Sequence, residues 1–347
     1  MNVDNNIYEF PDAKEIVVCG DIHGDFKALV YKCCVQYQMT GTLVVVAGDC
    51  GFGFQRTNYY QDLYMQLSDR LSKANNWIVF IRGNHDNPAY FDGQQVNYER
   101  WKAVPDYSVI KACGHTILCV GGAISIDRTY RINEMYGMTV VVEDDRRLEV
   151  AYYWPEEKPV YDQARLEAIS EACTIDTVIT HTAPSFCEKQ SRADIQNWLV
   201  KDEDLLSDLK DERRTMDRLL SFLKERHHPV DHWYYGHFHE SWHSEIEGVN
   251  YNMLDIMQLD QLEHENDVIN ERAELQVITE EQKQQLMATT LTTGMNAWEF
   301  VQSRPQDAQP WVAQGILSCI EKGYRLDLLM IGWETREQRR GQKKGTK

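Results

Sequence analysis

Short, almost continuous apolar runs alternate with longer amphipathic stretches in the first third of the chain. The apolar runs cover residues 15–19, 42–49 and 77–83, and they are rich in β-branched residues. Between them, residues 26–38 and 59–74 carry apolar side chains at a helical spacing. An apolar run without alternation is typical of a strand buried on both faces. The pattern therefore predicts an α/β fold in which helices cover both faces of a sheet.

The remainder of the chain divides into a folded part and a polar C-terminal part. Beyond about residue 262 the sequence turns polar, with short amphipathic pieces at residues 297–302 and 311–322. We predict one large domain over residues 1–260. We also predict an appendage over residues 261–347 that consists of a polar linker, short helices and a disordered tail. The later elements of the large domain are predicted strands at 115–122, 177–180, 232–236 and 245–254, the last with a hairpin glycine, and helices at 160–173 and 202–226.

The charge balance restricts the class of ligand. The chain has 36 Lys and Arg against 54 Asp and Glu, which gives a formal net charge of −18. Such a charge repels phosphate at long range and argues against a long nucleic acid or an anionic membrane as partner. It leaves room for a local phosphate site whose positive charge comes from metal ions.

The cysteines and the N-terminal sequence favour a cytoplasmic protein. Nine cysteines are scattered without CxxC pairs, and several lie inside apolar runs, which is typical of reduced thiols packed as small hydrophobes. The N-terminal stretch lacks the charged, apolar and small-residue order of a signal peptide, and no run reaches the length of a membrane span. We therefore expect a cytoplasmic location and no membrane partner.

Asp, Asn and His residues follow the predicted strands. Because ligands gather at the carboxyl ends of strands in open α/β sheets, we expect these side chains to converge in one cleft. Residues i and i+2 of an extended segment also point the same way, so each Asp-x-His or His-x-His pair can face one point. In chain order the set is Asp21, His23, Asp49, Asn84, His85, His181, His237 and His239.

This mixture of carboxylate, imidazole and amide groups is typical of a two-metal site. It suits divalent or trivalent Mn or Fe, with Zn as a further candidate, whereas a calcium or magnesium site would be nearly all oxygen. One Asp-x-His segment is more often a turn with a hydrogen-bonded histidine. The ordered set of such motifs favours the metal site over that simpler interpretation.

Five motifs in order, GDIHG, GDCG, GNHD, HTAP and GHFH, resemble those of the calcineurin-like metallophosphoesterase superfamily. The resemblance covers residues 16–254, and the C-terminal part resembles no family. A predicted strand at residues 121–131, together with WPEE at 154–157, is similar to a subgroup found in bacteria and phages. The resemblance implies a four-layer α/β/β/α sandwich with a dinuclear metal centre, to which a small, mainly helical appendage would be attached.

The resemblance also implies a role for each clustered side chain. Asp49 would bridge the two metal ions, and His85 would be the catalytic histidine, which can donate a proton to the leaving alkoxide or stabilise its charge. The remaining side chains would divide between the ions, with Asp21, His23 and His239 on one and Asn84, His181 and His237 on the other.

The second motif departs from that of the protein Ser/Thr phosphatases. Their GDxxDRG supplies an Asp that orients the catalytic histidine and an Arg that binds phosphate, whereas this chain reads GDCGFG. We therefore name Asp86 as a candidate partner of His85 and expect Arg82 to be structural. Arg128 and Arg131, which follow the Gly-Gly pair, are the candidate substrate contacts.

The function expected from these features is hydrolysis of a phosphate monoester, of small-molecule or nucleotide type, by metal-activated water. The alternative within the same class is a phosphodiesterase or nuclease, against which the acidic charge weighs. The rival from another class is a non-catalytic metal-binding scaffold whose C-terminal segment binds a protein partner. All seven metal ligands are present, which argues against the scaffold.

Overall fold

The computed structural model divides the chain into two compact units. The first comprises Met1–Val30 and Met39–His264, and the second comprises Tyr31–Gln38 and Glu265–Lys347. The residues described are 6–56, 58–137, 140–142, 146–148, 153–189, 195–262, 279–291, 295–303, 312–313, 316–317 and 320.

One sheet of the first unit contains the first three predicted strands. Its strand order is β15-β2-β3-β4-β6-β5. The inner strands are parallel, and β15 and β5 at the edges are antiparallel to their neighbours, so the carboxyl ends of β2, β3 and β4 lie at one edge. The bounds are β2 (Glu15–Cys19), β3 (Thr42–Val46), β4 (Trp77–Phe80), β5 (Asn97–Tyr98), β6 (Trp101–Ala103) and β15 (Leu259–Leu262).

The second sheet has the order β1-β7-β8-β11-β12-β14-β13. Its central strands β8, β11, β12 and β14 are parallel. The predicted hairpin glycine, Gly248, lies in the turn between β13 and β14, where Glu247 and Gly248 both have positive φ, as a tight hairpin turn requires. The bounds are β1 (Ile7–Glu9), β7 (Ser108–Ala112), β8 (His115–Val120), β11 (Thr177–Thr180), β12 (His232–Tyr235), β13 (Trp242–Ile246) and β14 (Val249–Met253), and a separate ribbon pairs β9 (Val140–Val142) with β10 (Arg146–Leu148).

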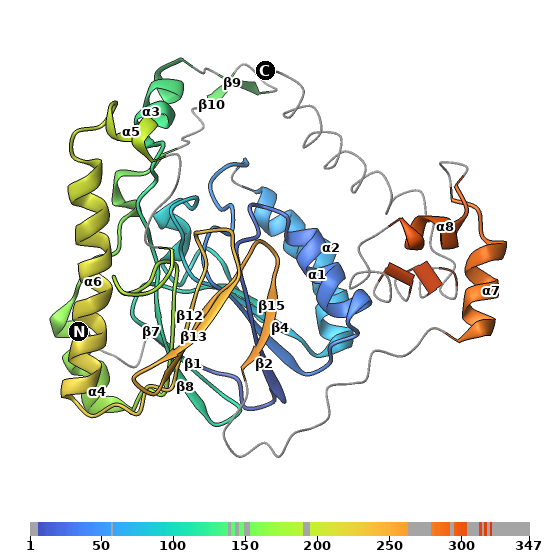
Figure 1. Ribbon diagram of the computed structural model, residues 1–347, viewed down its shortest axis with the longest axis horizontal. Coiled ribbons are helices and arrows are strands. Elements are labelled where there is room, and N and C mark those ends of the chain that lie inside the picture. The colour runs from blue at the N-terminus through green and yellow to red at the C-terminus, as the bar shows by residue number, and fades with distance from the viewer. Residues whose placement is uncertain are drawn as a thin grey trace. The chain divides into compact units, whose positions relative to one another are not determined.

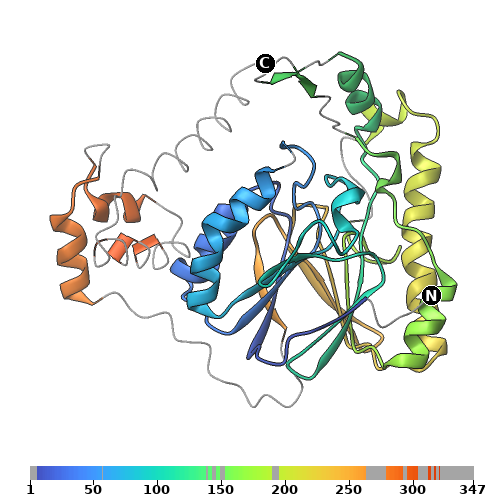
Figure 2. The same ribbon diagram turned by 180° about the vertical axis from the view of Figure 1, so that it is seen from behind.

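The two sheets pack face to face and helices cover their outer faces, as Figures 1 and 2 show from opposite sides. Helices α1 and α2 flank the first sheet, and α4 and α6 flank the second. This is the expected α/β/β/α sandwich. The helices are α1 (Phe26–Tyr31), a π-helical turn (Lys32–Gln36), α2 (Tyr59–Ala74), α3 (Arg128–Gly137), α4 (Gln163–Ala172), α5 (Gln196–Leu199) and α6 (Leu205–Glu225), with 3₁₀ turns at Pro88–Phe91 and Pro155–Glu157.

Both faces of the first sheet are buried, which explains its unbroken apolar strands. Val18 and Val45 belong to the core between the sheets, together with Ile117 and Ile179 of the second sheet. On the other face, aromatic rings from the helices cover the strands. The ring of Phe26 lies 5.7 Å from that of Phe80, measured between centroids. Burial of these apolar faces from water is the main force that holds the layers together.

The second unit includes α7 (Glu280–Ala288), α8 (Ala297–Gln302) and the π-helical turn Lys32–Gln36. Helix α7 begins with a capping box between Thr279 and Gln282, which satisfies backbone donors at the helix start. Leu286 and Val301 belong to one small apolar cluster of this unit. The helix predicted at residues 311–322 falls mainly outside the described residues, and the predicted tail falls wholly outside them. The domain boundary stays a prediction.

Three local predictions differ from the structure. Residues 121–131 form a loop that leads into α3, so the predicted strand there is wrong. The helix predicted at residues 26–38 is α1 followed by a π-helical turn. Strand β15, which no sequence pattern indicated, extends the first sheet past β2. Among the described residues, no helix has both the length and the apolar character needed to cross a bilayer.

Candidate metal centre

The predicted ligands lie in loops at the carboxyl ends of strands from both sheets. Asp21 and His23 follow β2, Asp49 follows β3 and Asn84 follows β4. The parallel register of these strands places the three loops at one edge of the first sheet. The second sheet contributes His181 after β11, and His237 and His239 after β12.

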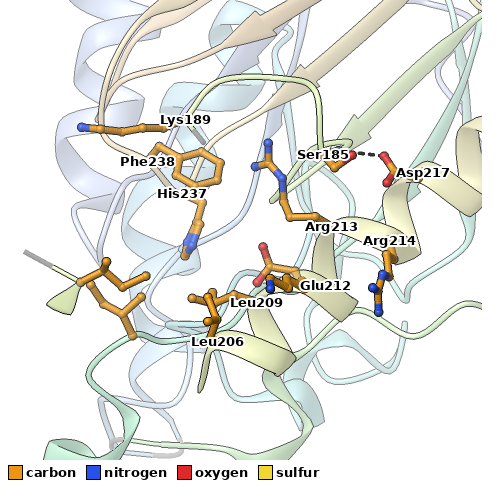
Figure 3. A pocket seen from close by; sticks show the side chains of 13 residues that line it. Ser185, Lys189, Leu206, Leu209, Glu212, Arg213, Arg214, Asp217, His237 and Phe238 are labelled. Carbon is orange, nitrogen blue, oxygen red and sulfur yellow. Dashed lines mark hydrogen bonds between the residues drawn. The ribbon is translucent and has the colours of Figure 1, made fainter. Parts of the chain in front are cut away.

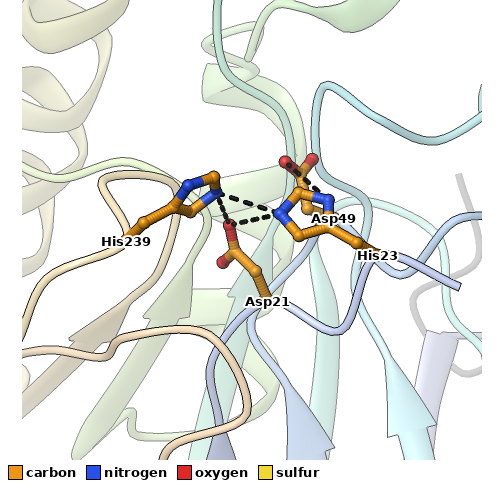
Figure 4. A group of neighbouring side chains, drawn as sticks. All are labelled: Asp21, His23, Asp49 and His239. Atoms are coloured by element: carbon orange, nitrogen blue, oxygen red, sulfur yellow. Dashed lines mark hydrogen bonds and ion pairs between the residues drawn. The ribbon is translucent and has the colours of Figure 1, made fainter. Parts of the chain in front are cut away.

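The first cluster of candidate ligands contains Asp21, His23, Asp49 and His239, whose ligand atoms all lie within 4.8 Å of one another (Figure 4). His239 Nε2 lies 3.0 Å from Asp21 Oδ2 and 3.0 Å from His23 Nε2. The four side chains come from three different loops and point toward one place. The arrangement can hold one metal ion.

The second cluster contains Asp49, His181 and His237, again within 4.8 Å. Asn84 joins it, because Asn84 Oδ1 lies 3.1 Å from His181 Nε2. Asp49 Oδ1 lies 3.1 Å from the same nitrogen. Asp49 therefore belongs to both clusters, as a residue that bridges two ions must.

The donor atoms fit metal ions better than they fit one another. Asp21 Oδ2 is buried and makes no hydrogen bond within the described part of the chain, although His239 Nε2 is only 3.0 Å away. A buried carboxylate oxygen without a hydrogen bond is costly, and a cation would satisfy it. His181 directs Nδ1 to the carbonyl of Ala47 at 2.7 Å, which leaves Nε2 to face Asn84 and Asp49.

The pKa values of the clustered side chains also favour a cation at this place. Burial would lower the pKa of His181, but the adjacent Asp49 carboxylate and its hydrogen bond raise that pKa to about 9. Burial would likewise raise the pKa of Asp49, but His85 and His181 hold it well below its usual range. Both shifts show that positive charge is favoured beside Asp49, which a metal ion would supply.

Backbone conformation and two glycines allow this crowding. His23, Asp49, His237 and His239 all have positive φ, which is uncommon for residues other than glycine and typical of functional sites. A Cβ atom at Gly236 would lie 2.2 Å from Asp21 Oδ1. One at Gly83 would lie 2.2 Å from Asp49 Oδ1. The glycines of the GNHD and GHFH motifs are therefore needed so that the backbone can pass close to these two carboxylates.

His85 lies beside the clusters and belongs to neither. Its backbone N–H donates to Asp49 Oδ1 at 2.7 Å, and its Nε2 is 4.0 Å from Asp49 Oδ2. The Arg131 guanidinium contacts both ring nitrogens, with Nη1 at 3.3 Å from Nδ1. Burial lowers the pKa of His85 to about 4; the Asp49 carboxylate opposes this shift and Arg131 adds to it.

The two arginines named as substrate contacts differ in their partners. Arg128 donates to Asp202 and Asp208, with Nε 2.6 Å from Asp202 Oδ2, so two carboxylates already neutralise it. Arg131 is held by Asp127 at 2.7 Å and reaches His85. Of the two arginines, Arg131 is the better placed to contact a substrate.

Asp86 has a structural role and does not orient His85. Its carboxylate accepts hydrogen bonds from four backbone N–H groups at 2.7 to 3.0 Å, those of Cys50, Gly51, Phe52 and Gly83. It thereby fixes the loop after β3 against the loop after β4. Arg82 is also structural, as predicted, since Nη2 binds Asp106 at 2.8 Å.

Sequence reasoning missed two buried residues behind Asn84. Asn84 Nδ2 donates to Ser125 Oγ at 2.9 Å. Ser125 Oγ in turn donates to Glu157 Oε2 at 2.6 Å, and Ser125 N donates to Glu157 Oε1 at 2.8 Å. The two residues lie in the GGAISIDRTYR and WPEE segments, whose resemblance to the bacterial and phage subgroup was the available signal.

Comparison with known proteins yields a match to a family. The family model described as calcineurin-like phosphoesterase matches residues 14–241. No curated protein matches the chain.

Several solved structures are similar at low identity. TT1561 of Thermus thermophilus is 13% identical over 72% of this chain and 98% of that one, with a TM-score of 0.39. Phosphopantetheinyl hydrolase (PptH) from Mycobacterium tuberculosis is 15% identical over 72% and 96% of the two chains, with a TM-score of 0.34. GAP50 of Plasmodium is 14% identical over 70% and 71%, also with a TM-score of 0.34. At these TM-scores the similarities carry no argument about substrate.

Proposed function

The chain belongs to the calcineurin-like phosphoesterase family, and from this premise we propose that it is a two-metal phosphatase of small phosphate monoesters. Membership makes it a metal-dependent phosphoester hydrolase. The single observation that carries the finer proposal is the pair of ligand clusters that share Asp49. Metal ions held there would supply positive charge to bind the phosphate and would lower the pKa of a bound water.

We propose that the side chains divide these tasks as the resemblance to the family implies. Asp21, His23 and His239 would hold one ion, and Asn84, His181 and His237 the other. Asp49 would be shared between them. Because imidazoles make up more than half of this set, Mn or Fe is the proposed metal, with Zn as the alternative.

His85 and Arg131 would act on the ester from beside the ions. His85 belongs to neither ligand cluster, so it would stabilise the developing charge on the leaving oxygen, by a hydrogen bond or a proton, as the phosphorus–oxygen bond breaks. The Arg131 guanidinium lies against this ring and would contact the phosphate oxygens. We assign no such role to Arg128, because Asp202 and Asp208 already bind it.

The test is metal removal followed by assay of p-nitrophenyl phosphate beside bis-p-nitrophenyl phosphate. We expect excess EDTA to abolish hydrolysis, and Mn²⁺ to restore it better than Mg²⁺ because of the imidazole ligands. The monoester should be the better substrate. Preference for the diester would favour a phosphodiesterase or nuclease. Full activity after long incubation in EDTA would overturn the two-metal proposal.

A variant of Asp49 and a matched control test whether the metal ions bind at this site. Asp49→Asn removes the one carboxylate common to both clusters, so metal analysis should show fewer than two ions bound. Asp62→Asn makes the same change in an exposed ion pair on α2, with Arg56, and should leave the metal content unchanged. Loss of metal in both variants would contradict the assignment of Asp49.

A further inference from the structure

A cavity of about 450 Å³ lies beside His237 and runs along α6 (Figure 3). His237 of the second ligand cluster forms part of its wall, and Phe238 lies next to it. Leu206 and Leu209 of α6 form the facing wall. The volume is within the range of small-molecule sites. A molecule in this cavity would therefore contact one of the candidate metal ligands.

The walls of this cavity are mainly apolar. Leu206 and Leu209 lie in the first turn and a half of α6, and Ile126 and Ile195 complete an aliphatic surface beside the Phe238 ring. Leu206 is 46% exposed, so part of this apolar surface is accessible to a ligand. Contact between these apolar side chains and an apolar ligand is favourable, because it removes apolar surface from water.

Most charged groups around the cavity already have partners. Arg213 donates to the carbonyls of Pro184 and Cys187 and lies 5.3 Å from the centre of the Phe238 ring. Glu212 accepts from Ile124 N at 2.6 Å. Lys189 pairs with Glu240 and Arg214 with Asp211. Asp217 accepts from Ser185 N at 2.8 Å, and the remaining charged residue of the wall, Lys210, is exposed on α6. Most of the charged groups are therefore engaged with the protein itself.

We propose that this cavity binds the organic group of the substrate, and that this group is compact and apolar, such as an aryl or branched alkyl group. The proposal rests on the proposed phosphatase function and narrows its substrate class. Phosphate recognition falls to the metal centre, while the cavity offers the organic group an apolar surface on two sides, formed by Phe238 and by Leu206 and Leu209.

The test compares a substrate that fills the cavity with one that cannot reach it. The substrates are 1-naphthyl phosphate and methyl phosphate, and the variants are Leu209→Arg and the neutral Leu209→Asn. We expect both variants to lower kcat/KM for 1-naphthyl phosphate by about 10- to 100-fold, the usual effect of lost apolar contact. Methyl phosphate should be hydrolysed as by the unchanged protein. Ser207→Arg, at an exposed α6 position outside the cavity, is the matched control and should affect neither substrate.

Two results would overturn the proposal: no change for 1-naphthyl phosphate, or an equal loss for both substrates. Failure of the phosphatase function is distinguishable, because then the metal-loaded wild-type protein would hydrolyse neither ester. In that case binding of non-hydrolysable 1-naphthylmethylphosphonate decides the question of the cavity. Its affinity should fall about tenfold in Leu209→Asn. Equal affinity for wild type and variant would reject the cavity as a binding site.

Discussion

An asparagine amide carries an oxygen at one end and a donor group at the other, so a neighbour must fix which end faces a metal ion. At Asn84 that neighbour is Ser125, which accepts a hydrogen bond from Nδ2 at 2.9 Å. Ser125 can accept because its own hydroxyl donates to Glu157. The oxygen of Asn84 is thereby directed toward His181 and Asp49.

At the residue scale, we predict that Ser125→Ala weakens metal binding at the second cluster by about 10- to 100-fold, the usual effect of losing a group that orients a ligand. Mn²⁺ titration monitored by electron paramagnetic resonance would show one site weakened and the other unchanged. Ser221→Ala, which removes an exposed hydroxyl bonded within α6, is the control. Two sites of unchanged affinity in Ser125→Ala would show that Ser125 does not position Asn84.

The residue types at the strand ends were enough to predict which side chains gather. They could not predict the partners of those side chains. Asp86 follows His85 in sequence, yet its carboxylate binds the backbone of a loop more than thirty residues earlier. Arg128 looked available for a substrate, but α6 and the loop before it supply two carboxylates to it. Such pairings depend on how distant loops meet, which no local pattern encodes.

At the element scale, the long periodic elements were predictable and the short irregular ones were not. Strands β2, β3 and β4 are buried on both faces, so their composition indicates them clearly. Strand β15 has the sequence LDQL and is mostly half-exposed, so it lacks both an apolar run and a clear alternation. The apolar residues after the Gly-Gly pair suggested a strand, but there the chain leaves the sheet and turns into α3.

His228, which follows α6, contacts both α4 and the segment before β11. Its Nδ1 accepts from Ile175 N, just before β11, at 2.9 Å, and Nε2 lies 3.0 Å from Ser170 Oγ of α4. We predict that His228→Ala destabilises the fold by about 1–3 kcal/mol, because a buried N–H loses its acceptor. Urea denaturation at pH 7.5 would measure this. His227→Asn, at the exposed neighbouring position with positive φ, is the control and should be nearly neutral.

The lowered pKa of His228 predicts that its contribution to stability depends on pH. Burial and then Arg226 lower the pKa of His228 below its ordinary value of 6.5, so the folded protein keeps the ring neutral. Below about pH 6.5 the unfolded chain binds a proton that the folded chain does not, and the contribution to stability decreases. The difference between wild type and His228→Ala should therefore shrink from pH 7.5 to 5.5. A constant difference would contradict the neutral assignment.

At the scale of the whole molecule, the motifs predicted the sandwich and the family. Each motif follows one strand, so the order of the motifs along the chain reflects the order of the strands. The metal identity, the cytoplasmic location, the exclusion of long nucleic acids and a protein partner for the C-terminal segment stay predictions. The second unit has its own apolar cluster around Leu286 and Val301, so it has the beginnings of an independent core. Truncated chains can therefore test where the first unit ends.

Residues 255–262 bind directly to the GDIHG loop. Strand β15 pairs with β2 from Leu259 opposite Cys19 to Leu262 opposite Ile16. Gly20 N donates to the carbonyl of Gln258 at 3.0 Å, and Met257 N donates to that of Asp21 at 2.9 Å. These bonds hold the backbone that carries two candidate metal ligands. Without β15, the edge of β2 would also be left unpaired, which promotes aggregation.

We therefore predict opposite outcomes for two truncations. A chain that ends at residue 264 keeps β15, and it should remain soluble, bind two metal ions and keep its hydrolytic activity. A chain that ends at residue 254 loses β15, and it should aggregate or bind less metal at the first cluster, because Asp21 and His23 lose their support. Gel filtration and metal analysis would distinguish these outcomes. If the shorter chain binds two ions as a monomer, β15 is dispensable. If the longer chain is insoluble, the second unit is needed to complete the core of the first.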